Sequence, residues 1–118
     1  MNTSADSSVL IEVRDSAVWI TLNRPAALNA ITLDIVAGIQ AALDRAERDD
    51  IRAVVLSGSG RAFCAGADLK FVRATSGEDG QNVSKFLKSV LDMMTRLERF
   101  PRPVIAAGGV LAAVGWVI

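Results

Sequence analysis

Hydrophobic and polar positions alternate in two short runs near the start of the chain. Val9–Arg14 and Val18–Leu22 are rich in β-branched residues, and the turn-forming residues Asp15 and Ser16 separate them. This pattern predicts a β-hairpin. Pro25 ends the second run, because proline cannot donate a hydrogen bond to a central ladder.

The next pattern has the period of an amphipathic helix. Thr32 is a suitable N-cap, and Asp34 places a negative charge in the first turn, where the helix dipole favours it. We therefore predict a helix over residues 33–48. Its apolar residues recur every three or four positions along one face, at Ile35, Ile39, Leu43 and Ala46.

Three further elements follow. The nearly continuous apolar run Ala53–Ser57 is typical of a buried parallel strand after a crossover helix. Helical spacing predicts a second helix over residues 83–100, and a last strand is expected at 104–107. The expected apolar face of that helix consists of Val83, Leu87, Val90, Leu91, Met94 and Leu97. Strands alternating with helices predict an α/β fold, in one domain over residues 9–118.

Composition narrows the functional classes. Thirteen basic residues balance thirteen acidic ones, so nothing favours binding to nucleic acid or to an acidic membrane surface. The single cysteine, Cys64, excludes an internal disulfide, and we expect it to be a small packed residue. There is no histidine, which excludes a Ser-His-Asp or Cys-His catalytic device within this chain. No His/Cys cluster has metal-ligand spacing, so we predict no metal.

The two ends of the chain differ in composition from the segments between them. Residues 1–8 lack the basic and apolar regions of a signal peptide, so we expect a flexible tail and a cytoplasmic location. Residues 104–118 are fifteen uncharged residues, which raises a membrane anchor as an alternative. Because about 20 apolar residues are needed to span a bilayer, we expect no membrane association.

Candidate chemistry concentrates in the glycine-bearing connection from Ser57 to Lys70. Small residues at 64–67 let a ligand approach the backbone closely, and backbone N–H groups at such a turn can donate to an oxyanion. A loop of this kind is also common in turns without a binding role. The dinucleotide-binding and phosphate-loop glycine spacings are both absent.

Four motifs follow one another along the chain. They are Asn23-Arg24-Pro25 with Leu28-Asn29-Ala30-Ile31, then Ala53-Val54-Val55-Leu56-Ser57-Gly58, then Phe63-Cys64-Ala65-Gly66-Ala67-Asp68-Leu69-Lys70, and then Phe100-Pro101-Arg102-Pro103-Val104-Ile105-Ala106-Ala107. In this order they resemble motifs of the crotonase superfamily, the enoyl-CoA hydratase/isomerase proteins; the third resembles the family's F-x-A-G-A-D-L/I-K and the fourth its x-P-K-P-V-I-A-A. Each is weak alone, but the combination is specific and covers residues 9–107.

The resemblance implies a crotonase-like (ClpP/crotonase) spiral of ββα units, incomplete at its C-terminus. It implies an acyl-CoA thioester as ligand, with coenzyme A as part of the substrate and no separate cofactor. Ala67 matches the residue whose backbone N–H forms half of the oxyanion hole for an enolate-like species. By its residue type alone, Ala67 is equally suited to be a small turn residue.

The same resemblance implies which residues border the CoA moiety. They belong to two segments and are Arg24, Ala26, Leu28, Ala65, Gly66, Asp68, Leu69 and Lys70. Asp68 is also suited to cap a helix, and Lys70 to be an ordinary solvated lysine.

The resemblance weakens after Ala107, where the family continues V-N-G-x-x-x-G-G-G-x-E. The glycine triplet is not recognisable, and no acidic residue occurs after Glu98. We therefore expect a truncated, inactive member of a family that hydrates or isomerises unsaturated acyl-CoA. The alternative is a non-catalytic remnant that binds CoA weakly or associates with full-length relatives. A homotrimer or hexamer is implied by the family, although the shortened chain puts this in doubt.

Overall fold

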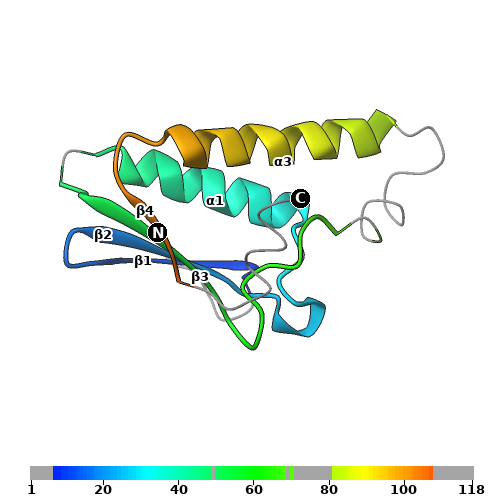
Figure 1. Cartoon of the computed structure of the whole chain (residues 1–118), viewed down its shortest axis with the longest axis horizontal. Coiled ribbons are helices and arrows are strands. Elements are labelled where there is room, and N and C mark those ends of the chain that lie inside the picture. Colours follow the sequence, from blue (N-terminus) through cyan, green and yellow to red (C-terminus); the bar gives the residue numbers. More distant parts are fainter. Residues whose placement is uncertain (1–6, 49, 69, 71–80, 108–118) are drawn as a thin grey trace.

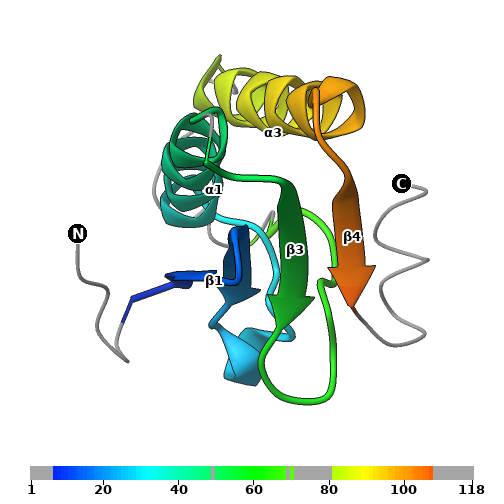
Figure 2. The same ribbon diagram turned by 90° about the vertical axis from the view of Figure 1, so that its left-hand side faces the viewer.

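The computed structural model describes residues 7–48, 50–68, 70 and 81–107. These residues form a four-stranded sheet with two long helices on the same side of it (Figure 1, Figure 2). In chain order the elements are β1 (Val9–Arg14), β2 (Ala17–Leu22), the 3-10 turn η1 (Pro25–Ala27), α1 (Leu33–Ala46), β3 (Ala53–Gly58), α3 (Gln81–Arg99) and β4 (Val104–Ala107).

The sheet has the simple order β1-β2-β3-β4. β1 and β2 form the predicted hairpin, whose turn residues Asp15 and Ser16 have φ angles of 52° and 65°, as hairpin turns matched to the strand twist require. β2 pairs with β3 in parallel, and β3 with β4 in parallel. The predicted parallel strand after a crossover helix is confirmed, as are the α/β class and the short last strand.

The core lies between the sheet and α1. The inward side chains of β2 and the α1 stripe predicted at Ile35, Ile39, Leu43 and Ala46 are at most 2% exposed. The Thr32 hydroxyl accepts a hydrogen bond from the Ile35 N–H at 3.4 Å, so Thr32 is the N-cap of α1, as predicted. The helix ends at Ala46 rather than 48.

The predicted apolar face of α3 is partly wrong. Leu87 and Leu91 are 40% and 62% exposed. The buried positions are instead Phe86, Val90, Met93 and Leu97, at intervals of four, three and four residues. The buried stripe therefore keeps the predicted Val90 and Leu97 but includes Phe86 and Met93 in place of Leu87 and Leu91. The packing of α3 against the rest of the core selects this side of the helix.

Trp19, predicted to be a core residue, is only half-buried. It follows Val18 and precedes Ile20, both fully buried, so the alternation of the strand directs its ring to the opposite face of the sheet. There the Arg14 guanidinium carbon lies 4.1 Å from the centroid of a Trp19 ring, a cation–π contact across the hairpin.

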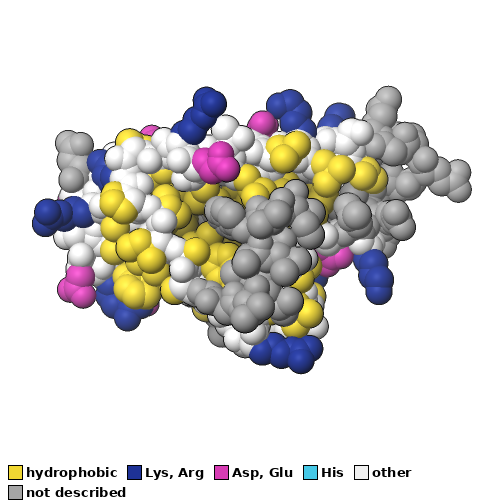
Figure 3. Space-filling model, in the orientation of Figure 1, with side chains coloured by type: hydrophobic (Ala, Val, Ile, Leu, Met, Phe, Trp, Pro, Cys, Tyr) yellow, Lys and Arg dark blue, Asp and Glu magenta, His cyan; other side chains and the backbone are white. Residues whose placement is uncertain are grey.

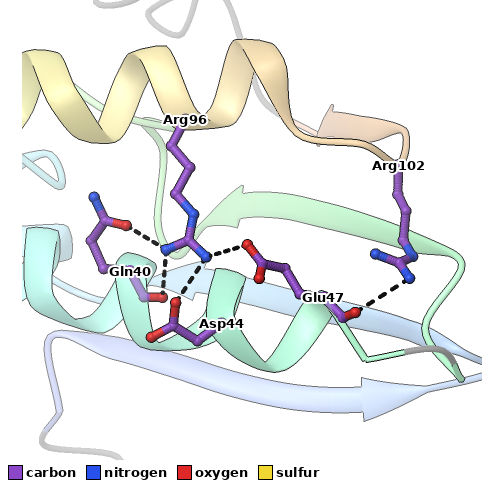
Figure 4. A network of polar contacts seen from close by, with 5 residues as sticks. All are labelled: Gln40, Asp44, Glu47, Arg96 and Arg102. Carbon is purple, nitrogen blue, oxygen red and sulfur yellow. Dashed lines mark hydrogen bonds and ion pairs between the residues drawn. The ribbon is translucent and has the colours of Figure 1, made fainter.

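A polar network joins α3 to α1 (Figure 4). The Arg96 guanidinium donates to the Gln40 side-chain oxygen at 2.7 Å, to Asp44 at 2.8 Å and to Glu47 at 2.7 Å. Burial alone would lower the pKa of Arg96, but the hydrogen bonds and charges of Glu47 and Asp44 raise it. Both carboxylates are more than half exposed, so solvent screening leaves the network a modest stabilising effect and a role in orienting the helices.

β4 is the edge of the sheet within the described residues. Ile105 is 53% exposed, and apolar side chains gather on the face of the molecule below α3 (Figure 3). A groove of about 430 Å³ opens there, between β4 and the end of α3, and is lined partly by Leu56, Phe100 and Ala106.

We predict that Leu43→Ala lowers the free energy of unfolding by about 3 kcal/mol, because it leaves a cavity at a fully buried position of the core. Urea denaturation followed by circular dichroism measures the change. Leu91→Ala on α3 is the matched control and should change stability by less than about 0.5 kcal/mol. Equal effects of the two variants would contradict the core described here.

Candidate functional site

Two loops meet at one end of the parallel pair β2–β3. Residues 23–31 follow β2 and residues 59–68 follow β3, and parallel strands bring their carboxyl ends to the same edge of a sheet. Ser59 joins the loops directly: its N–H and hydroxyl both donate to the Leu22 carbonyl, at 2.8 and 3.1 Å. Both segments singled out by sequence are therefore at one place in the fold.

A fully buried side chain, that of Asn29, holds the two loops together. Its amide oxygen accepts from the Arg24 N–H at 2.7 Å, and its amide nitrogen donates to the carbonyls of Ser59 at 2.9 Å and Ala62 at 2.7 Å. Asn29 has a φ of 57°, a left-handed conformation that asparagine tolerates better than most residues. Sequence reasoning quoted Asn29 in a motif but assigned it no role.

The Arg24 side chain also turns into this junction. Its Nη1 donates to the Ala30 carbonyl at 2.6 Å and lies 3.2 Å from Oδ2 of Asp68. The Arg24 and Asp68 side chains are 26% and 16% exposed. Asp68, for which a helix cap was the alternative role, thus contacts the first loop.

Gly58 allows the second loop to fold back on itself. A Cβ atom at this position would overlap the carbonyl oxygens of Phe63 and Ala62 and the side-chain nitrogen of Asn29. Only glycine leaves room for this close approach of backbone to backbone. Gly66, farther along, has a φ of 96°, which other residues rarely adopt.

The backbone of Ala67 is oriented by an isolated parallel bridge to Ile31. The Ile31 N–H donates to the Gly66 carbonyl, and the Asp68 N–H donates to the Ile31 carbonyl, both at 2.8 Å. Because successive amides of an extended backbone point in opposite directions, the Ala67 N–H points away from Ile31. No hydrogen bond joins this N–H to any other described residue, so it can donate to a ligand.

The other residues implied to border CoA differ in exposure. Ala26 and Ala65 are exposed, and Leu28 is half-buried with a left-handed φ of 54°. Lys70 is exposed, and Leu69 lies outside the described residues. The exposed positions Ala26 and Ala65 therefore carry small side chains, whereas Leu28 and Lys70 carry long ones.

Cys64 is packed on the inner side of the second loop, as predicted, at 7% exposure. It lines a small apolar cavity of about 20 Å³ together with Phe63, Met93 and Met94. Burial raises the pKa of the Cys64 thiol, and a hydrogen bond from the Gly66 N–H partly opposes this. A neutral, buried thiol is a weak nucleophile, so Cys64 is a packing residue here.

The described ranges offer neither a metal site nor a membrane-spanning helix. No group of three or more His, Cys, Asp or Glu side chains in them could hold a metal ion. None of the helices in the same ranges is long and apolar enough to cross a bilayer. The segment 108–118, which includes most of the alternative membrane anchor, lies outside the described residues.

We predict that Asn29→Ala destabilises the protein by about 3 kcal/mol, because the carbonyls of Ser59 and Ala62 and the Arg24 N–H all lose their partner. The change is measured by urea denaturation. Ser89→Ala, which removes an exposed hydroxyl on α3, is the control and should stay within about 0.5 kcal/mol. An unchanged stability of Asn29→Ala would show that these hydrogen bonds do not hold the loops.

Comparisons with known proteins agree with the fold. The enoyl-CoA hydratase EchA19 of Mycobacterium tuberculosis is 36% identical over 83% of this chain and 37% of its own length. The 1,2-epoxyphenylacetyl-CoA isomerase of Escherichia coli is 38% identical over 91% of this chain and 42% of its own. The solved structure of Pseudomonas aeruginosa PA4980 superposes with a TM-score of 0.79 at 34% identity, over 90% of this chain and 46% of that one.

The chain therefore spans less than half of the length of each of these three relatives. The structural match confirms the crotonase-like fold, present here in part. The sequence model of the enoyl-CoA hydratase/isomerase family matches residues 17–111, most of the chain, which includes both loops of the site. The chain belongs to the enoyl-CoA hydratase/isomerase family.

Proposed function

We propose that the chain binds an acyl-CoA thioester at the junction of the two loops and polarises its carbonyl group. The observation that carries this proposal is the Ala67 N–H, which points away from Ile31 and which no other described residue engages. A fixed N–H donor stabilises the negative charge that develops on a thioester oxygen when an enolate-like species forms. Family membership over residues 17–111 supports the choice of ligand.

The same proposal assigns the CoA moiety to the solvent side of the junction. Ala26 of the first loop, and Ala65 and Gly66 of the second, have a small side chain or none, and Leu28 adds an apolar one. Lys70 is exposed and carries a positive charge suited to the phosphates of CoA. Leu69 is included because it lies between Asp68 and Lys70 in the family motif.

Proton transfer is a separate requirement of hydration or isomerisation. The chain has no histidine, and the carboxylate of Asp68, next to Ala67, is paired with Arg24. We therefore propose that the residues described here bind and polarise the ligand but hydrate it slowly at best. A non-catalytic role in CoA binding, alone or beside longer relatives, is the second candidate. A crotonyl-CoA hydration assay on the purified chain, run beside a binding measurement, separates the two.

The oxyanion role is tested by calorimetric titration with crotonyl-CoA and with free CoA, which lacks the thioester carbonyl. Ala67→Pro removes the N–H and should weaken crotonyl-CoA binding by about tenfold while leaving CoA binding unchanged. Any hydration present should fall by about 10²–10³. Ala67→Gly keeps the N–H and is the control. If Ala67→Pro binds both ligands as the wild type does, Ala67 is not the donor.

A further inference from the structure

We infer that Arg24 and Asp68 form a positioning pair that holds the Ala67 N–H in the orientation in which it points away from Ile31. This role deepens the proposed function and, in its ligand-binding consequence, rests on it. The resemblance to the family placed both residues beside CoA. In the structure their side chains also contact each other and the backbone of the loops.

The direction of the Ala67 N–H depends on the two backbone hydrogen bonds of the bridge, from the Ile31 N–H to Gly66 and from the Asp68 N–H to Ile31. This bridge is isolated and belongs to no strand of the sheet. Two hydrogen bonds at the meeting point of two loops have no cooperative ladder behind them, so other contacts must hold the segments in register.

The Arg24 guanidinium lies beside the bridge. Its Nη1 donates to the carbonyl of Ala30, the residue directly before Ile31, at 2.6 Å. The same atom lies 3.2 Å from Oδ2 of Asp68, the residue directly after Ala67. One guanidinium therefore contacts both sides of the bridge, one residue away from it on each side.

The backbone of Arg24 is held by Asn29. The Arg24 N–H donates to the Asn29 side-chain oxygen at 2.7 Å, and the Arg24 carbonyl accepts from the Asn29 N–H at 2.9 Å. The backbone of Arg24 is thus fixed to a fully buried residue, and only its side chain is directed toward Asp68. Because the side chains of Arg24 and Asp68 are mostly shielded from water, the pair is stronger than the exposed ion pairs of this chain.

The inference makes a local prediction that needs no ligand. Arg24→Gln or Asp68→Asn should speed hydrogen exchange at the bridge amides, those of Ile31 and Asp68, by about tenfold or more. Exchange at Val54 and Leu56 in β3 should stay unchanged, because the core is not altered. The double variant should lose no more protection than either single variant, since the two residues act as one unit. NMR-detected exchange on the full chain measures these rates.

The control is Lys88→Gln, which removes an exposed ion pair to Asp92 of similar length, 3.1 Å, on α3. It should leave the hydrogen-exchange rates of the Ile31 and Asp68 amides unchanged. Unchanged exchange at Ile31 and Asp68 in the Arg24 and Asp68 variants would overturn the inference. Equal acceleration at all amides, β3 included, would overturn it as well, because the pair would then contribute only to global stability.

A second experiment tests how the pair affects the bound thioester. Infrared spectra of crotonyl-CoA with a ¹³C-labelled carbonyl report how strongly the bound carbonyl is polarised. In both single variants the red shift of that band should shrink. A red shift equal to that of the wild type in both variants would overturn the positioning role. If the wild type itself shows no red shift, the proposed function fails. The exchange rates alone then test whether Arg24 and Asp68 hold the bridge.

Discussion

The site depends on the hydrogen-bonding requirement of one buried amide. Asn29 lies where the chain leaves β2, and its side chain connects the Arg24 N–H to two carbonyls in the loop after β3. Burying an amide without partners is costly, so the two loops are stable only in the arrangement that satisfies all three groups. That arrangement brings Ile31 beside Ala67 and Arg24 beside Asp68.

The sheet supplies the frame on which this requirement acts. Parallel pairing of β2 with β3 places both loops at one edge, and Gly58 lets the second loop fold back to Asn29. The core beneath packs the strands against α1 through buried apolar side chains. Function is thus proposed for backbone groups rather than side chains, which explains why the loops are rich in small residues.

Hydrophobic periodicity predicted the buried face of α1 but only part of the buried face of α3. The α1 stripe was predictable because its apolar positions are unambiguous and its N-cap is Thr32. For α3 the sequence offers neighbouring apolar residues on more than one face, such as Phe86 with Leu87 and Met93 with Met94. Which of each pair is buried depends on the surface of α1, where Arg96 also pairs with Gln40, Asp44 and Glu47. Such choices depend on a partner surface that is distant in sequence.

By itself, the sequence determined the element order, the hairpin, the α/β class and the family, because periodicity, turn residues and ordered motifs are local properties. It also indicated that the loop around Ala67 is the candidate site. Only the tertiary structure decided that Asn29 joins the loops, that Arg24 pairs with Asp68 and that the Ala67 N–H faces away from Ile31. These contacts join residues 30 to 44 positions apart, and a pairing at that separation depends on the path of the chain rather than on local pattern.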